Sequence, residues 1–206
     1  MAETEEKKNK EAAAAEEAAE KAAEGKTEEK KKEEKPKFPP PPDKVEGFVH
    51  LHVHTEYSLL DGAARLVSGK KSPLLDAVWN KGMRAMAITD HGNMFAAYTF
   101  QKKAKDHGIK SIIGCEFYTC ADMTVHDRDR NHLLLIAKNN EGYYNLVKLN
   151  SLAYTQGFHY KPRIDLKLLK EHSKGLICLS ACLAGKIPQL LLADDYEAAK
   201  QYAIML

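Results

Sequence analysis

The sequence contains no run of apolar residues close to the roughly 18 that a membrane-spanning helix requires. Its first residues, MAETEEKKNK, are charged and lack the apolar core of a secretory signal. These two absences predict a cytoplasmic protein without a membrane partner. Cysteine is also scarce, and no two of the four cysteines form a C-x-x-C pair. We therefore expect reduced thiols rather than a disulfide framework.

Short motifs that would assign a chemistry directly are missing as well. Neither G-x-x-x-x-G-K nor G-x-G-x-x-G occurs, so the sequence predicts no glycine-rich loop for phosphate. There is no G-x-S-x-G nucleophile elbow. Covalent catalysis by serine or cysteine is therefore without support in the sequence.

Charge is distributed unevenly along the 206 residues. Residues 1–46 contain 11 lysines and 14 acidic residues, with an alanine-rich stretch and a short polyproline spacer at 38–42. This composition predicts a disordered tail, or alternatively a partner-binding arm, ahead of a domain at 47–206. The remaining 160 residues hold 20 basic and 15 acidic residues. Such a mildly basic balance permits a phosphate-bearing partner without requiring one.

Residues 48–62, FVHLHVHTEYSLLDG, form the most informative stretch. Histidine occupies every second position, at His50, His52 and His54. In a β-strand alternate side chains share a face, so all three imidazoles would point the same way. Neutral imidazole is the commonest metal ligand, and the pattern predicts part of a metal site. His50 is interpreted differently, as a histidine packed under the sheet.

Further along, short apolar segments alternate with amphipathic ones. The alternation predicts buried strands at 84–89, 109–118, 132–137 and 175–180, and helices at 73–82, 95–107, 141–154, 163–172, 187–192 and 195–206. Ser72 is expected to cap the first of these helices. Together they favour a parallel sheet or an α/β barrel. A barrel needs more strands than these, so we expect the chain to be part of a longer protein.

The candidate functional residues lie within or just after the predicted strands, where parallel architectures carry their sites. The predicted metal ligands are His52, His54, Asp61, His91, Glu116, His132 and Cys182. Divalent metals bind nitrogen and oxygen ligands of this mixture, and two or three such ions can activate water and clamp a phosphate. Glu116 is the expected bridge between ions, because an unpaired carboxylate in an apolar strand would be costly. Asp90 is expected to orient His91.

Several of these residues have a structural alternative. Asp61 with Gly62 is equally typical of a turn. His91 is also explained as an exposed imidazole near a helix start. His132 can be a strand-edge residue without a partner, and cysteines such as Cys182 are more often buried than ligating. Their joint occurrence at strand ends favours the metal site. The other histidines, His107, His126, His159 and His172, are interpreted as surface residues.

Six blocks of sequence resemble the PHP (polymerase and histidinol phosphatase) family, and more narrowly the N-terminal PHP domain of bacterial DNA polymerase III alpha subunits. The blocks are FVHLHVHTEYSLLDG, AITDHGNM, GIKSIIGCEFY, HLLLIAKNNEGYYNLVKL, YKPRIDLKLL and LICLSACLAGKIP. The resemblance implies an α/β fold, a distorted (β/α)7 barrel of the TIM type, which this chain would leave incomplete at its C-terminus.

The resemblance also implies roles for the predicted ligands. His52 and His54 match the first motif, Asp61 stands where some members place a further ligand, and the other four match later positions. The family's remaining ligands come from an Asp-x-His motif that this sequence lacks. The implied cofactor is a cluster of divalent ions, with Zn²⁺ or Mn²⁺ expected and Mg²⁺ for a polymerase site outside this chain.

The implied function belongs to DNA replication. The parent protein would be a DNA-directed DNA polymerase, a nucleotidyltransferase, with DNA and other replicative holoenzyme subunits as partners. Its PHP site would carry metal-dependent phosphodiesterase chemistry of the 3′–5′ exonuclease type. Two alternatives stay open: a free-standing PHP phosphatase that acts on histidinol phosphate, and a structural PHP module without catalysis.

Overall fold

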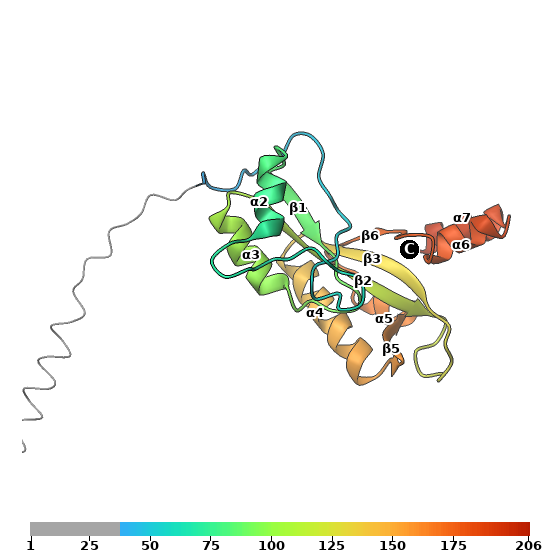
Figure 1. Cartoon of the computed structure of the whole chain (residues 1–206). Coiled ribbons are helices and arrows are strands. Elements are labelled where there is room, and N and C mark those ends of the chain that lie inside the picture. Colours follow the sequence, from blue (N-terminus) through green and yellow to red (C-terminus); the bar gives the residue numbers. More distant parts are fainter. Residues whose placement is uncertain (1–37) are drawn as a thin grey trace, which may run out of the picture. The chain divides into compact units, whose positions relative to one another are not determined.

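The computed structural model describes residues 38–206, shown in colour in Figure 1. They form a mixed sheet whose strands are β1 (Ala85–Ile88), β2 (Lys110–Cys120), β3 (Asn131–Ala137), β4 (Phe158–His159), β5 (Lys161–Asp165) and β6 (Leu176–Leu179). The long strand β2 organises the sheet. It pairs in parallel with β1 and β5 and antiparallel with β3, which in turn pairs antiparallel with β6. β4 pairs antiparallel with β5.

Helices connect and flank these strands. They are α2 (Pro73–Asn80), α3 (Ala97–Asp106), α4 (Asn140–Thr155), α5 (Leu166–Glu171), α6 (Lys186–Leu192) and α7 (Tyr196–Met205). Side-chain caps begin three of them: Asn139 accepts a hydrogen bond from Gly142 N, Asp165 accepts one from Leu168 N, and Asp195 accepts one from Ala198 N. The prediction of Ser72 as the N-cap and Pro73 as the first helical residue of α2 is confirmed, although the Ser72 hydroxyl makes no capping hydrogen bond.

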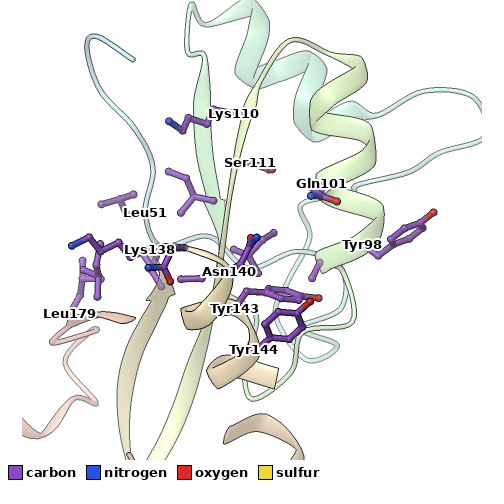
Figure 2. A pocket seen from close by; sticks show the side chains of 17 residues that line it. Leu51, Tyr98, Gln101, Lys110, Ser111, Lys138, Asn140, Tyr143, Tyr144 and Leu179 are labelled. Atoms are coloured by element: carbon purple, nitrogen blue, oxygen red, sulfur yellow. The ribbon is translucent and has the colours of Figure 1, made fainter. Parts of the chain in front are cut away.

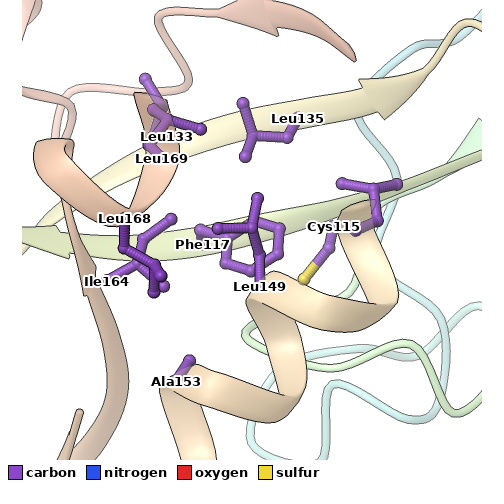
Figure 3. Close-up of a cluster of buried hydrophobic side chains, with 10 residues drawn as sticks. Cys115, Phe117, Leu133, Leu135, Leu149, Ala153, Ile164, Leu168 and Leu169 are labelled. Atoms are coloured by element: carbon purple, nitrogen blue, oxygen red, sulfur yellow. The ribbon is translucent and has the colours of Figure 1, made fainter. Parts of the chain in front are cut away.

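Helices α4 and α5 cover one face of the sheet (Figure 3). Cys115 and Phe117 of β2 pack there with Leu133 and Leu135 of β3, and all four are buried. Burying a leucine or phenylalanine side chain contributes about 1.5–3 kcal/mol. Because strand side chains alternate, the residues next to these four along each strand point to the opposite face. Glu116 and His132 therefore share the face that α4 and α5 leave free.

The expectation of a parallel sheet is wrong at β3. β2 ends at Cys120, and polar residues 121–130 lead directly into the antiparallel strand β3 without a helix. A parallel connection would require a crossover of a dozen or more residues. The short helix predicted within residues 163–172 is confirmed as α5, which begins at Leu166. The strands β4 and β5 that precede it were not predicted.

The described residues do not close a barrel, because β4 and β6 lie at the two ends of the strand order. The prediction that the strand near 175–180 is buried is wrong. Ile177 is 47% exposed, Cys178 is exposed, and α6 contributes no buried side chain. What the structure supports is a mixed α/β sheet, open within residues 38–206.

The predicted histidine strand is not a regular strand, because a single isolated bridge, from His50 to Met86, joins this segment to β1. Ala87 N donates to His50 O, and Thr89 N donates to Val53 O, each at 2.8 Å. The stretch from His50 to Val53 therefore lies opposite the shorter stretch from Ala87 to Thr89. The histidine segment has one extra residue here, as in a β-bulge. The bulge interrupts the regular alternation between residues 50 and 53.

The bulge separates His50 from the other two histidines. His50 is exposed, and its ring packs edge-on against Phe48 with centroids 4.8 Å apart. The interpretation of His50 as a histidine under the sheet is therefore wrong. His52 and His54 turn instead toward Glu116 of β2.

The predicted tail falls mainly on residues 1–37, which lie outside the described residues. Residues 38–43 do not follow the prediction, because they contact the domain. The Phe38 ring lies edge-on to Trp79, with centroids 4.8 Å apart, and stacks on His107 at 4.9 Å. Lys110 Nζ donates to Asp43 O at 2.6 Å. The contact with Phe38 also means that His107 is not the free surface residue that was expected.

Candidate metal centre

Glu116 lies at the centre of a group of imidazoles on the free face of β2. Its side chain is 1% exposed. Oε2 contacts Nε2 of His52 and lies 3.7 Å from Nε2 of His54. Oε1 lies 2.6 Å from Nδ1 of His132 and 2.9 Å from Nδ1 of His91. Each carboxylate oxygen therefore faces one pair of histidines.

The four rings pack against one another. His54 and His91 are stacked with centroids 3.9 Å apart, and His52 lies edge-on to His54 at 4.9 Å. The possible ligand atoms form two groups, each with all its atoms within 4.8 Å of one another. The groups are His52, His54 and Glu116, and His91, Glu116 and His132. Glu116 is common to both, as a bridging ligand would be.

Three buried polar atoms of this cluster have no hydrogen-bond partner: His54 Nδ1, His91 Nδ1 and Glu116 Oε1. The nitrogens beside Oε1 are close enough for hydrogen bonds, but their orientation is wrong for them. Each unsatisfied buried polar group costs about 1–3 kcal/mol, a cost that a cation among them would remove. Imidazole and carboxylate ligands suit Zn²⁺ and Mn²⁺. The residues present therefore fit a cluster of divalent ions.

The environment sets the charge of these groups. Burial alone would raise the pKa of Glu116, but the contacts with His132, His52 and His91 outweigh burial and hold that pKa far below its usual range. Burial, together with the neighbouring His91, lowers the pKa of His54. The contact with Glu116 raises the pKa of His91. At neutral pH Glu116 is an anion and His54 is neutral, which is the form of imidazole that binds metals.

Residues 50–206 match the family model of the PHP domain. The chain belongs to the PHP domain family. Curated relatives at 44–51% identity are named DNA polymerase III subunit alpha. That of Treponema pallidum is 49% identical over 162 residues, which cover 76% of this chain and 13% of the relative. That of Helicobacter pylori (strain 26695) is 51% identical over 145 residues, covering 69% and 12%. The Thermus aquaticus protein is 47% identical, covering 74% and 13%.

The chain thus spans about 13% of the length of the curated relatives it matches. A solved structure of an amidohydrolase from Chromobacterium violaceum is 18% identical, with a TM-score of 0.36, over 52% of this chain and 33% of that one. That likeness is too low to bear on the fold. In the part of the chain that the structure describes, no helix is both long and apolar enough to cross a membrane.

Two of the predicted ligands lie at the border of the PHP cluster rather than in either group. Asp61 Oδ2 is 3.0 Å from Nε2 of His91, the nitrogen that faces away from Glu116. This hydrogen bond lowers the pKa of Asp61. Cys182 is exposed, and its Sγ lies 3.6 Å from His132 Nδ1. The alternative of a buried cysteine is therefore wrong. Asp61 contacts the cluster through His91, and Cys182 contacts it through His132.

The expected role of Asp90 is wrong. Its carboxylate does not contact the His91 ring. It accepts hydrogen bonds from Thr55 N and Oγ1 at 2.6 and 2.8 Å and from Ser58 Oγ at 2.7 Å. Ser58 Oγ in turn accepts from His91 N at 3.1 Å. Asp90, 2% exposed, thus holds the loop that follows His54 against the strand that leads to His91.

Tyr118 belongs to the surroundings of the site and was missed. Its ring lies edge-on to His132 at 5.2 Å, and burial raises its pKa to about 12. The period of two along β2 places it on the same face as Glu116, and this pattern was available in the sequence. Gly92 has φ +59°, and a Cβ there would lie 3.0 Å from the Tyr118 ring. Glycine at this position lets the chain pass close to the tyrosine.

Two hollows differ in their relation to this cluster. A cleft of about 550 Å³ opens beside it, and Asp61, His91 and His132 line the cleft. A larger hollow of about 650 Å³ has Tyr98 of α3 and Tyr144 of α4 in its lining (Figure 2). None of the predicted ligands lines the larger hollow. The smaller cleft is the one that gives access to the cluster.

Proposed function

We propose that this PHP domain binds a cluster of Zn²⁺ or Mn²⁺ ions and hydrolyses phosphodiester bonds at the 3′ end of DNA. The proposal rests on one observation above others, the buried Glu116 carboxylate with one oxygen toward each of two histidine pairs. Divalent ions supply Lewis acidity, which neutralises phosphate charge and makes water a stronger nucleophile.

The side chains of the domain divide the remaining work. Glu116 supplies the negative charge between two sites, which reduces the repulsion between cations bound close together. The imidazoles that would hold the ions are those of His52, His54, His91 and His132. Asp61 accepts the hydrogen bond of His91 Nε2 and so leaves Nδ1 facing the cluster. Asp90 fixes the loop that carries Thr55 and Ser58.

The names of the relatives support DNA as the substrate, since all those cited are DNA polymerase III alpha subunits. We propose that the longer protein of this kind is a DNA-directed DNA polymerase and works with other replication subunits. Polymerisation is not assigned to the 206 residues themselves, which span about 13% of such relatives. The hydrolytic site is the part of the function for which this chain carries residues.

A 5′-labelled primer with a mismatched 3′ end tests the proposal. The purified chain with added Zn²⁺ or Mn²⁺ should shorten the primer from its 3′ end, and a chelator should stop the reaction. Glu116→Gln should abolish shortening. His50→Ala is the matched control and should leave it unchanged, because His50 lies on the same segment but is exposed and away from Glu116.

Two results would count against the proposal. A folded, metal-loaded chain that releases no nucleotide would rule out the nuclease. Release of phosphate from histidinol phosphate, without any release from DNA, would indicate a phosphatase instead. Circular dichroism of each variant shows whether a loss of activity reflects a loss of fold.

A further inference from the structure

The cleft beside the Glu116 cluster has an aromatic lining. Its aromatic residues are Tyr57, Phe95, Tyr118, Tyr154, Phe158 and Tyr160. Phe95 is 66% exposed, Phe158 54% and Tyr160 61%. Rings as exposed as these contribute little to a core, and their gathering on one concave surface marks a binding site. We call this surface the aromatic cleft.

Tyr160 is presented to the cleft by a strained turn. It is the single residue between His159 of β4 and Lys161 of β5, which face each other across the strand pair. Its φ is +57°, a conformation that bulky side chains rarely adopt. The Arg128 guanidinium lies 4.4 Å from the centre of its ring, and His159 packs edge-on at 4.6 Å. Backbone strain of this kind gathers at binding sites, where the surrounding structure maintains it.

Two cations complete the cleft. Lys161 and Arg130 both line it, and Lys161 Nζ lies 5.4 Å from the centre of the Tyr118 ring. Among residues 38–206, neither cation forms an ion pair with a carboxylate, whereas the nearby Arg163 is paired with Asp127. The positive charge of Lys161 and Arg130 is therefore available for an anion in the cleft.

We propose that the aromatic cleft binds single-stranded nucleic acid, with bases stacked on Tyr160 and Phe158 and phosphates held by Lys161 and Arg130. Alternating rings and cations match the alternating bases and phosphates of an unpaired strand. The proposal deepens the proposed function and rests on it. His91 and His132 line the same cleft, so a strand bound there presents a phosphodiester to the cluster.

This arrangement also determines which substrates the site selects. A small phosphate ester has no ring to stack and gains only the contact with the cations. A duplex keeps its bases stacked on one another and cannot offer them to Tyr160. Unpaired nucleotides use both kinds of contact, and stacking is tolerant of sequence because every base has a π-face.

Fluorescence anisotropy of a labelled single-stranded DNA oligonucleotide tests the cleft in EDTA, where no hydrolysis occurs. Tyr160→Gly removes the ring and relieves the turn, because glycine adopts φ +57° freely. We expect it to weaken binding about 5- to 150-fold, which corresponds to the loss of one base-stacking contact. Lys161→Gln should reduce the slope of log K against log salt by about 0.7.

Tyr98→Ala and Lys102→Gln are matched controls on α3, exposed and outside the cleft lining, and should leave affinity within about twofold. A duplex of the same length should bind more weakly than the single strand. The inference is overturned if the folded chain binds no oligonucleotide, if Tyr160→Gly binds as tightly as the wild type, or if Tyr98→Ala loses as much. If the chain binds through Tyr160 but hydrolyses no DNA, the inference about the aromatic cleft stands and the proposed nuclease activity is refuted.

Discussion

Replacing Arg163 with methionine should destabilise the domain by about 3 kcal/mol and release the loop between β2 and β3. Arg163, in β5, is 0% exposed. Its guanidinium donates to Val125 O at 2.7 Å, to Asp127 O at 3.1 Å and to Asp127 Oδ1 at 3.0 Å. These bonds hold residues 121–130 against the sheet. Methionine has a similar length but no donor to replace them.

The magnitude follows from these contacts. Three short hydrogen bonds at about 1 kcal/mol each give about 3 kcal/mol. The bonds to Gly157 O and Met123 O, at 3.4 and 3.5 Å, are long and add little. The Asp127 side chain is 52% exposed, so water can replace the guanidinium there. The loss therefore stays below the roughly 5 kcal/mol of a fully buried pair.

Thermal unfolding followed by circular dichroism measures this change. A loss of about 3 kcal/mol should lower Tm by about 6–12 °C for a domain of this size. Trypsin should also cut faster at Arg128 within the released loop. Arg65→Met is the matched control and should cost less than about 0.5 kcal/mol, since Arg65 is 67% exposed and 3.6 Å from Glu56. An Arg163→Met protein that melts within about 2 °C of the wild type would refute the reasoning.

Phe38→Ala should shift the emission of Trp79, the only tryptophan, to longer wavelength and cost about 1–2 kcal/mol in urea unfolding, because the ring pair is lost; unchanged emission would contradict the contact. Gly92→Ala should cost about 2 kcal/mol or more, from its φ of +59° and its close approach to neighbouring side chains. Gly82→Ala, at φ +80° in open space, should cost only about 1 kcal/mol, and equal costs would remove the crowding argument.

The residues of the cluster were predictable because ionisable side chains occupy positions in or beside segments that are otherwise apolar. Glu116 interrupts an apolar strand, and a buried carboxylate requires partners. His52 and His54 follow the strand period, and the structure turns both toward Glu116. The exclusion of His50 was expected, but its cause was not. A bulge depends on the register between two segments that the sequence does not align.

Contacts between distant segments limited the prediction elsewhere. Asp90 was assigned to His91 because the two are adjacent in sequence, yet its partners Thr55 and Ser58 come more than 30 residues earlier. The direction of β3 depends on how residues 121–130 return, and apolar periodicity does not encode that direction. Phe38 is one aromatic residue at the end of a charged tract, so average composition concealed its contact with Trp79.

Metal binding by Glu116→Gln is the most direct test of a bridged cluster. Elemental analysis and titration of the purified 206-residue chain should find stoichiometric Zn²⁺ or Mn²⁺ in the wild type and in His50→Ala. Glu116→Gln removes the charge shared by both groups of ligands and should weaken metal binding by at least about 100-fold. A folded wild-type chain without metal, or a Glu116→Gln chain that binds it as tightly as the wild type, would contradict the assignment.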